Sequence, residues 1–310
     1  MNWLKTRLAA AQATDIVFLA YVTFSGMLFA AFGWKFSPGI WIGLTLAHIA
    51  MVALGLWFAG QPLRYPSLAG FVRDAYPILL VVFLYWELRY LALLFGSGYN
   101  DPLILRLEEV IFGEQLAMTF SQRLPYLWLS ELMHSFYALY WILLPMALFA
   151  LYFRGKAEGF RELVYVETIV FFGCYLAFIS FPVQGPHYEF PMISGPLADG
   201  FFYKMVHWVL ADGGSKGAAF PSSHVAVAVA ILLVTWQHDR VVFAVMAPLV
   251  IGLTIGTVYG RFHYGMDATS GILAGVILFA IALYLRGFLE RSSGPGPAAP
   301  AGNSPGSPAV

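Results

Sequence analysis

The chain has 310 residues, of which 60% are hydrophobic, 17% aromatic and only 11% charged. A soluble domain carries roughly a quarter charged residues, so this composition excludes an ordinary soluble protein and indicates an integral membrane protein. The formal net charge is zero, so the chain has no basic field for nucleic acid and we expect no nucleic-acid partner. Cys174 is the single cysteine and cannot form an internal disulfide.

Eight apolar stretches reach or approach the length of about 20 residues that a helix needs to cross a bilayer. They run roughly over residues 16–33, 39–59, 75–96, 129–152, 163–182, 220–236, 241–259 and 267–286. The first is longer than the apolar core of a signal peptide, so we interpret it as an uncleaved span. The sequence therefore predicts an all-α integral membrane protein with about eight transmembrane helices.

Three other segments lack the character of a span. Residues 103–124 and 201–210 mix apolar and charged side chains, as do helices that lie in the membrane surface. Either segment would gate the approach of a lipid or act as an ordinary interfacial connector, and the sequence leaves both readings open. Residues 291–310 are rich in Gly, Pro and Ser, so we expect a disordered tail.

Two short motifs place histidines at the edges of apolar spans. They read Phe220-Pro-Ser-Ser-His224 and Arg261-Phe-His-Tyr-Gly-Met-Asp267. Because Asp267 follows His263 by four residues, a helix would stack the two side chains. The carboxylate would orient the imidazole so that its other nitrogen can attack phosphorus, and His224 would protonate the leaving oxygen. The alternative is that both histidines merely cap helix ends or reach towards the interface.

Residues beside these histidines are candidate phosphate contacts. Ser222 and Ser223 begin a span, where serine caps are favoured and free backbone N–H groups bind anions. Arg261 is positioned to hold a phosphate bidentately, or else to anchor the chain at the interface. No cluster has the spacing of metal ligands, so we expect neither a metal nor another cofactor.

Charged residues inside spans need partners or a polar cavity. Glu131 with His134, and Glu87 with Arg89, are two such sets. We interpret both as structural pairs in preference to catalytic ones.

Lys and Arg residues fall unequally on the two sides of the predicted spans. One side holds ten, at positions 5, 7, 64, 73, 154, 156, 161, 240, 286 and 291, and the other holds six, at positions 35, 106, 123, 204, 216 and 261. Because cytoplasmic ends carry the excess of positive charge, the first side should face the cytoplasm. His224, His263 and Asp267 would then face the extracytoplasmic side. We expect a multi-pass protein of a bacterial inner (plasma) membrane.

The two histidine motifs resemble the second and third signature motifs of the type 2 phosphatidic acid phosphatase superfamily, which includes lipid phosphatases, vanadium haloperoxidases and sphingolipid phosphotransferases. The resemblance implies a six-helix catalytic core, which we assign to residues 75–290, after two extra helices in residues 1–74. It also implies a phosphohistidine intermediate on His263, His224 as general acid and base, and no metal requirement. His187 and Lys216 would then be additional phosphate contacts, or else solvated loop residues.

The chain departs from the superfamily pattern in two places. The first motif, a Lys followed after six residues by Arg-Pro, is missing, and Thr257 stands where the third motif has an arginine, so that Arg261 would supply that charge. In place of the first motif stands Phe181-Pro-Val-Gln-Gly-Pro-His-Tyr188, which is similar to a region of inositol phosphorylceramide and sphingomyelin synthases. Asn100-Asp101 and Gly113 also look like the inositol phosphorylceramide synthase branch.

The preferred function is that of a membrane enzyme that takes a phosphoryl or phosphoalcohol group from a lipid phosphate onto His263. It would pass this group to water or, as the resemblance slightly favours, to the hydroxyl of a lipid alcohol. One alternative is a plain phosphatase of lipid phosphates or polyprenyl pyrophosphates. An alternative of another class is a non-catalytic lipid transporter or scramblase, and vanadate-dependent oxidation is the least favoured reading.

Overall fold

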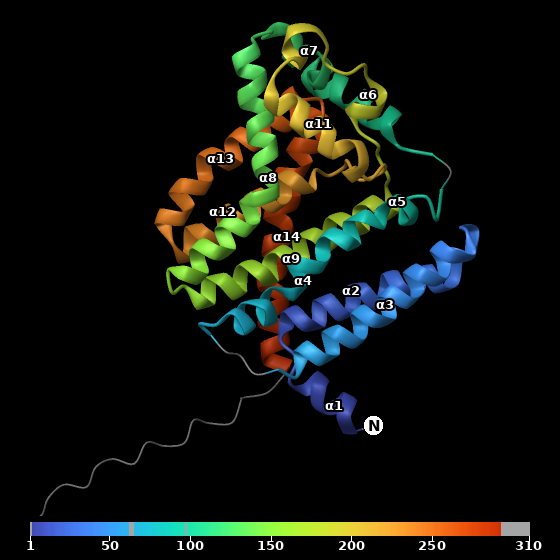
Figure 1. Cartoon of the computed structure of the whole chain (residues 1–310), viewed down its shortest axis with the longest axis vertical. Helices are drawn as coiled ribbons and strands as arrows, with labels where there is room; N and C mark the ends of the chain where they lie inside the picture. Colours follow the sequence, from blue (N-terminus) through green and yellow to red (C-terminus); the bar gives the residue numbers. More distant parts are fainter. Residues whose placement is uncertain (1, 62–64, 97, 293–310) are drawn as a thin grey trace, which may run out of the picture.

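The computed structural model describes residues 2–61, 65–96 and 98–292, and within these ranges every regular element is a helix. The helices are α1 (Asn2–Ala9), α2 (Ala13–Phe32), α3 (Pro38–Ala59), α4 (Leu68–Trp86), α5 (Leu88–Leu91), α6 (Asp101–Phe112), α7 (Leu116–Arg123), α8 (Leu127–Phe153), α9 (Ala157–Ser180), α10 (Pro186–Glu189), α11 (Phe201–Gly213), α12 (Ser223–His238), α13 (Arg240–Tyr259) and α14 (Gly265–Ser292), with short 3-10 turns at Gly33–Lys35 and Gly195–Ala198 (Figure 1). The expected disordered tail lies outside the described residues from position 293 onward.

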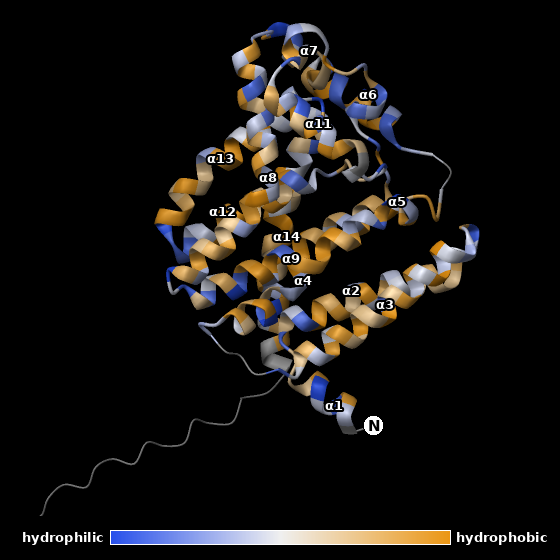
Figure 2. Cartoon of the chain, viewed as in Figure 1, coloured by the Kyte–Doolittle hydropathy of each residue, from blue (hydrophilic) through white to orange (hydrophobic). Residues whose placement is uncertain are grey.

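Seven of the described helices are long and apolar enough to cross a membrane, namely α2, α3, α4, α8, α9, α13 and α14. The eighth predicted span is the 16-residue helix α12, which is apolar but shorter. It begins at Ser223 and not at residue 220, because the Oγ of Ser222 accepts a hydrogen bond from the Val225 N–H and caps the helix. Apolar residues dominate these helices in Figure 2. The prediction of an all-α, multi-pass integral membrane protein is confirmed.

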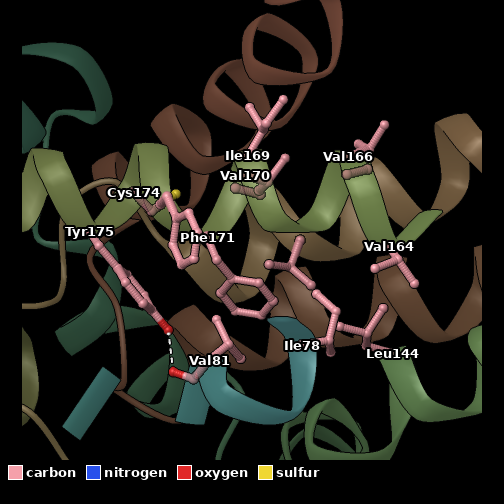
Figure 3. Packing of buried hydrophobic residues seen from close by; sticks show 14 of the residues in the cluster. Ile78, Val81, Leu144, Val164, Val166, Ile169, Val170, Phe171, Cys174 and Tyr175 are labelled. Carbon is pink, nitrogen blue, oxygen red and sulfur yellow. Dashed lines mark hydrogen bonds between the residues drawn. The ribbon is translucent and has the colours of Figure 1, made fainter. Parts of the chain in front are cut away.

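Helix α9 is the most enclosed of the spans and forms the centre of the core. It packs against α4, α12 and α14, and more than three quarters of its apolar window is buried. Figure 3 shows Ile78 and Val81 of α4 and Leu144 of α8 lying against the apolar face of α9. The Tyr175 hydroxyl donates to the Val81 carbonyl at 3.1 Å. Close packing and such interhelical hydrogen bonds are what hold helices together in a lipid environment.

The hairpin of α2 and α3 lies along α4 and α9, on the side away from α12 and α13 (Figure 1). One of its contacts with the rest of the bundle is a small buried polar cluster. The Nε2 atom of His48 lies 2.9 Å from the Ser25 hydroxyl and 3.4 Å from the Glu87 carboxylate. Glu87 therefore has its partner in the hairpin.

Four short helices, α6, α7, α10 and α11, gather at the end of the bundle where α12 begins and α13 ends (Figure 1). The predicted surface segment 103–124 is divided into α6 and α7, because Gly113 adopts a left-handed conformation with φ of 73° and ends α6. The predicted segment 201–210 is α11, which runs three residues further, to Gly213. These helices surround the histidine motifs.

Candidate functional site

The two histidine motifs meet where α12 starts and the chain turns from α13 into α14. His224 is the second residue of α12, and Asp267 lies in the first turn of α14. Glycines let the two helices approach closely, since a Cβ atom at Gly271 would lie only 2.7 Å from the carbonyl oxygen of Ser222. The Ser222 N–H donates to the Asp267 carbonyl oxygen at 3.0 Å. This packing brings segments forty residues apart into one site.

A chain of hydrogen bonds connects the three predicted catalytic residues. Nδ1 of His263 lies 3.3 Å from Oδ2 of Asp267, and Nε2 of His263 lies 3.2 Å from Nδ1 of His224. Nε2 of His224 lies 3.3 Å from the Tyr137 hydroxyl. When Asp267 is ionised, its carboxylate only accepts hydrogen bonds, which places the proton of His263 on Nδ1 and the lone pair on Nε2. Nε2 is therefore the ring nitrogen that carries the lone pair.

The environment of His263 favours the neutral imidazole. The residue is 3% exposed, and burial lowers its pKa to about 4. It is therefore unprotonated near pH 7, as a nitrogen nucleophile must be. Its orientation is fixed by Asp267, whose Oδ2 atom also accepts a hydrogen bond from the Tyr264 N–H at 2.9 Å.

The two histidines share a small pocket of about 60 Å³, which we call the polar pocket because imidazole, hydroxyl and amide side chains line part of it. Its lining consists of Tyr85, Tyr137, Gln184, His187, Tyr188, Leu210, Gly214, Ser215, Ala218, Ala219, His224, Phe262 and His263. None of these described lining residues is a lysine or an arginine. Polar contacts with a bound anion would have to come from imidazoles, hydroxyls and backbone amides.

A second, mainly apolar cavity of about 480 Å³ lies between α4, α8, α9, α11 and α12. It shares four lining residues with the polar pocket, namely Tyr85, Tyr137, Leu210 and His224. Leu79 and Val82 also line it and are 59% and 72% exposed, so the cavity reaches the lipid-facing surface of α4. His224 thus lies between a polar pocket and an apolar one.

The predicted phosphate contacts are distributed unevenly around this site. His187 lines the polar pocket, and burial lowers its pKa. Ser223 lines the apolar cavity, whereas the Ser222 hydroxyl is used to cap α12. Lys216 is exposed outside the lining, with its ammonium 4.9 Å from the ring centroid of Tyr188.

Arg261 lies outside the lining of the polar pocket, although it is only two residues from His263. Its guanidinium donates to the Pro191 carbonyl at 2.5 Å and to the Ser121 hydroxyl at 3.3 Å. Its backbone has a φ of 62°, in the left-handed region. Thr257, at the position of the missing arginine, contributes its carbonyl oxygen, which accepts from the N–H of His263 at 3.0 Å.

Sequence reasoning missed several residues of the site. Tyr137 and Tyr140 of α8 pack against His224, and the ring centroids of Tyr140 and His224 are 4.1 Å apart. No sequence signal distinguishes these tyrosines, because aromatic residues are common in all the spans. Arg89, for which the sequence predicts only a structural pair with Glu87, donates to the carbonyl of the lining residue Gly214 at 3.3 Å. Its position inside a predicted span was the one available signal.

Glu131, for which the sequence predicts a structural pair with His134, caps α11. Its carboxylate accepts hydrogen bonds from the N–H groups of Phe202 and Tyr203 at 3.1 and 3.2 Å. Nδ1 of His134 donates to the Ser130 carbonyl at 2.7 Å. Both contacts serve to hold helices in place.

Comparison with known families gives one match. A family profile described as the PAP2 superfamily matches residues 104–285, which is more than half of the chain. The match extends from α6 to α14 and includes His224, His263 and Asp267. Neither the curated proteins nor the solved structures that were compared with the chain gave a match.

Proposed function

The chain belongs to the PAP2 superfamily, and from this premise we propose that it is a membrane lipid phosphotransferase or phosphatase that works through a phosphohistidine intermediate. One observation carries the proposal. His263 and His224 line one polar pocket, with Nε2 of His263 3.2 Å from Nδ1 of His224, and this pocket shares lining residues with a large apolar cavity. A lipid phosphate needs both environments, one for its head group and one for its hydrocarbon chain.

In the first half of the proposed reaction, Nε2 of His263 attacks the phosphorus of the lipid phosphate. The N–P bond forms as the bond from phosphorus to the leaving oxygen breaks, and protonated His224 gives its proton to that oxygen. Asp267 stabilises the positive charge that develops on the His263 ring, since its carboxylate accepts a hydrogen bond from the Nδ1–H group. The product is a phosphohistidine and a released alcohol.

In the second half, water or a lipid hydroxyl attacks the phosphohistidine. His224, now neutral, takes the proton of the attacking hydroxyl, and the N–P bond breaks to regenerate His263. Water as the attacking group gives hydrolysis, and a lipid alcohol gives transfer. Both outcomes use the same residues.

We assign the phosphate contacts by whether each residue lines one of the two cavities. His187 would contact the phosphate directly, with Ser223 and the free N–H groups at the start of α12. Lys216 would supply positive charge at the rim beside Tyr188. Ser222 and Arg261 would act from outside the pocket, by holding the start of α12 and the segment at Pro191.

Transfer to a lipid alcohol is slightly favoured over hydrolysis. The support comes from the resemblance of residues 181–188 to the inositol phosphorylceramide and sphingomyelin synthase branch, together with the position of Gln184 and His187 in the pocket lining. The alternative is a plain phosphatase of lipid phosphates or polyprenyl pyrophosphates, for which the same site would suffice.

Purified protein in nanodiscs of mixed phospholipids would separate these activities. Lipid analysis with and without ceramide or diacylglycerol should reveal a new phosphoalcohol-bearing lipid only when the acceptor is present. Phosphate release that does not depend on the acceptor would indicate hydrolysis. If neither wild type nor His263→Ala changes any lipid chemically, but both move lipids across the bilayer, the protein would instead be a transporter or scramblase.

We further propose that the site faces the extracytoplasmic side of a bacterial inner membrane, with residues 75–290 as the catalytic core and residues 1–74 as an added part. The Lys and Arg distribution supports this orientation. In a variant without Cys174, a cysteine replacing Ser194 should react with a membrane-impermeant maleimide on intact cells, and one replacing Gly155 should not. The reverse labelling pattern would place the site in the cytoplasm.

A further inference from the structure

We infer that Asp101 and Glu108 of α6 are positioning residues that hold His263 in its reactive orientation, an inference that rests on the proposed role of His263 as nucleophile. The two carboxylates are seven residues apart and therefore lie on one face of the helix. They are 1% and 0% exposed. Neither forms an ion pair with a described residue, so each depends on hydrogen-bond donors for its stability.

Asp101 joins the two segments that border the polar pocket. Its carboxylate accepts hydrogen bonds from the backbone N–H groups of Gln184 and Gly185, both at 2.9 Å. The same group accepts from the Tyr264 hydroxyl at 3.0 Å. Gln184 lines the pocket and Tyr264 directly follows His263. One buried side chain therefore fixes the distance between the pocket wall and the proposed nucleophile.

Glu108 caps two helices with one carboxylate. Oε1 accepts from the N–H of Leu116, the first residue of α7, and Oε2 accepts from the N–H of Met266, in the first turn of α14. The distances are 2.9 and 3.1 Å. The first N–H groups of a helix have no partner within that helix, and a negative charge there is also favoured by the helix dipole. Glu108 thus fixes the start of α14, which carries Asp267.

The apolar part of the same α6 face completes this clamp. Ile104 lies between the two carboxylates and is 1% exposed. It packs in a cluster with Val183, Ala219 and Tyr264. The three buried residues of α6 therefore contact both the segment that follows His263 and the segment at residues 183–185.

The clamp acts on His263 through two neighbours. Tyr264 donates its backbone N–H to the Asp267 oxygen that also accepts from Nδ1 of His263. A displacement of Tyr264 or of the start of α14 would therefore turn the His263 ring relative to the pocket. Because a misplacement of about 1 Å at a reacting group can cost on the order of a hundredfold in rate, loss of the clamp should reduce turnover.

The test compares Tyr264→Phe, Asp101→Asn and Glu108→Gln with two control variants. Glu109→Gln makes the same chemical change on an exposed neighbour in α6, and Tyr126→Phe removes the hydroxyl of an exposed tyrosine. Full-length proteins in nanodiscs would be assayed for phosphate release from dioctanoyl phosphatidic acid. Histidine-selective ¹⁵N NMR would follow the His263 imidazole, whose signal is assigned by its loss in His263→Ala.

We expect kcat to fall about tenfold to a hundredfold in the clamp variants. KM should change little in Tyr264→Phe and Glu108→Gln, which leave the hydrogen bonds from Gln184 and Gly185 to Asp101 in place. The His263 signal should shift in the same variants and stay in place in the controls. Tyr264→Phe removes a single hydroxyl and keeps the test valid if a carboxylate variant fails to fold. Wild-type kcat and an unshifted His263 signal in folded clamp variants would overturn the inference.

The proposed function fails separately, if wild type and His263→Ala are equally inactive or equally active both in this assay and in the acceptor-dependent lipid assay described above. In that case the NMR signal still tests whether α6 orients His263.

Discussion

The two ends of the helical bundle stabilise their buried carboxylates in different ways. At the end away from the histidines, each of four carboxylates pairs with an arginine, in the pairs Asp15–Arg73, Asp74–Arg161, Asp239–Arg154 and Glu162–Arg286. At the histidine end, Asp101, Glu108 and Asp267 are bound by backbone N–H groups, a tyrosine hydroxyl and an imidazole. Among the described residues, the ion pair at that end is the solvated Arg123–Glu114, whose arginine is 68% exposed.

The arginine end compensates the charge of its carboxylates, whereas the histidine end uses its carboxylates to orient other groups. An arginine neutralises a carboxylate and joins two helix ends, but it tolerates small changes in geometry. Hydrogen bonds to backbone and imidazole fix direction, and they leave the negative charge of Asp267 available to the His263 ring. We therefore expect changes at the histidine end to act on turnover and changes at the arginine end to act on stability.

The largest expected effect is that of His263→Ala, which should abolish turnover and the acid-labile phosphoprotein. The reason is that no other described imidazole in the pocket lining has a carboxylate to orient it. The matched control is His238→Ala, which removes an imidazole 3.4 Å from Glu162 at the arginine end. Radiolabelled phosphate trapping at acid quench would measure the intermediate. Equal labelling of wild type and His263→Ala would rule out the covalent mechanism.

The next effect is that of His224→Ala, which should lose turnover and yet allow some phosphoprotein to be trapped. A lipid phosphate with an easily released alcohol needs little help from a general acid in the first step, whereas the second step requires a base. The same trapping assay would show the phosphoprotein persisting after turnover stops. Normal turnover in this variant would remove His224 from the mechanism.

Much of this arrangement could be predicted from the sequence, for physical reasons that also set the limits. The spans follow from composition, because a bilayer demands long apolar helices. The His263 and Asp267 pair follows from a four-residue spacing, which is a local property. The contacts of Tyr137 with His224, of Asp101 with Tyr264 and of Glu108 with Met266 join residues 87, 163 and 158 positions apart. Such contacts depend on the packing of whole helices, and no local pattern predicts them.

As the pH is lowered, the histidine end should lose folding stability before the arginine end does. Burial lowers the pKa of His263 from 6.5 to about 4, so between these pH values the unfolded state binds more protons and stability falls as the pH falls. At about 1.36 kcal/mol per pKa unit, the loss is on the order of 3 kcal/mol. The hydrogen bond from Arg154 lowers the pKa of Asp239 below 3.8, so its contribution is lost only at still lower pH.

Thermal unfolding between pH 7 and pH 4 would measure this difference. A His263→Gln variant should show a shallower pH dependence than wild type, whereas Asp239→Asn should follow the wild-type curve over this range. An unchanged slope in His263→Gln would show that another group controls the acid response.

A smaller effect is expected for Arg261→Lys. The guanidinium joins the Pro191 carbonyl to the Ser121 hydroxyl with two different nitrogens, and a lysine has one nitrogen for both acceptors. The variant should keep part of the wild-type kcat, and Arg261→Ala should keep less. Steady-state kinetics with phosphatidic acid would order the three proteins. Full activity of Arg261→Ala would mean that this residue serves neither phosphate binding nor the geometry of the site.

The smallest effect is expected at the arginine end, for Asp239→Asn. Asp239 both pairs with Arg154 and caps α13, where its Oδ1 atom accepts from the N–H groups of Val241 and Val242. An asparagine oxygen preserves the cap, so this variant removes only the charge pair, and the Arg154 side chain is 46% exposed. Such a pair is worth about 0.5 to 1 kcal/mol, whereas Asp239→Ala also loses the cap and should cost about 1 kcal/mol more. Tm should therefore fall slightly in the first variant and further in the second, with kcat unchanged in both. A large loss of kcat in Asp239→Asn would show that the two ends of the bundle are coupled, and that their carboxylates do not divide stability from turnover.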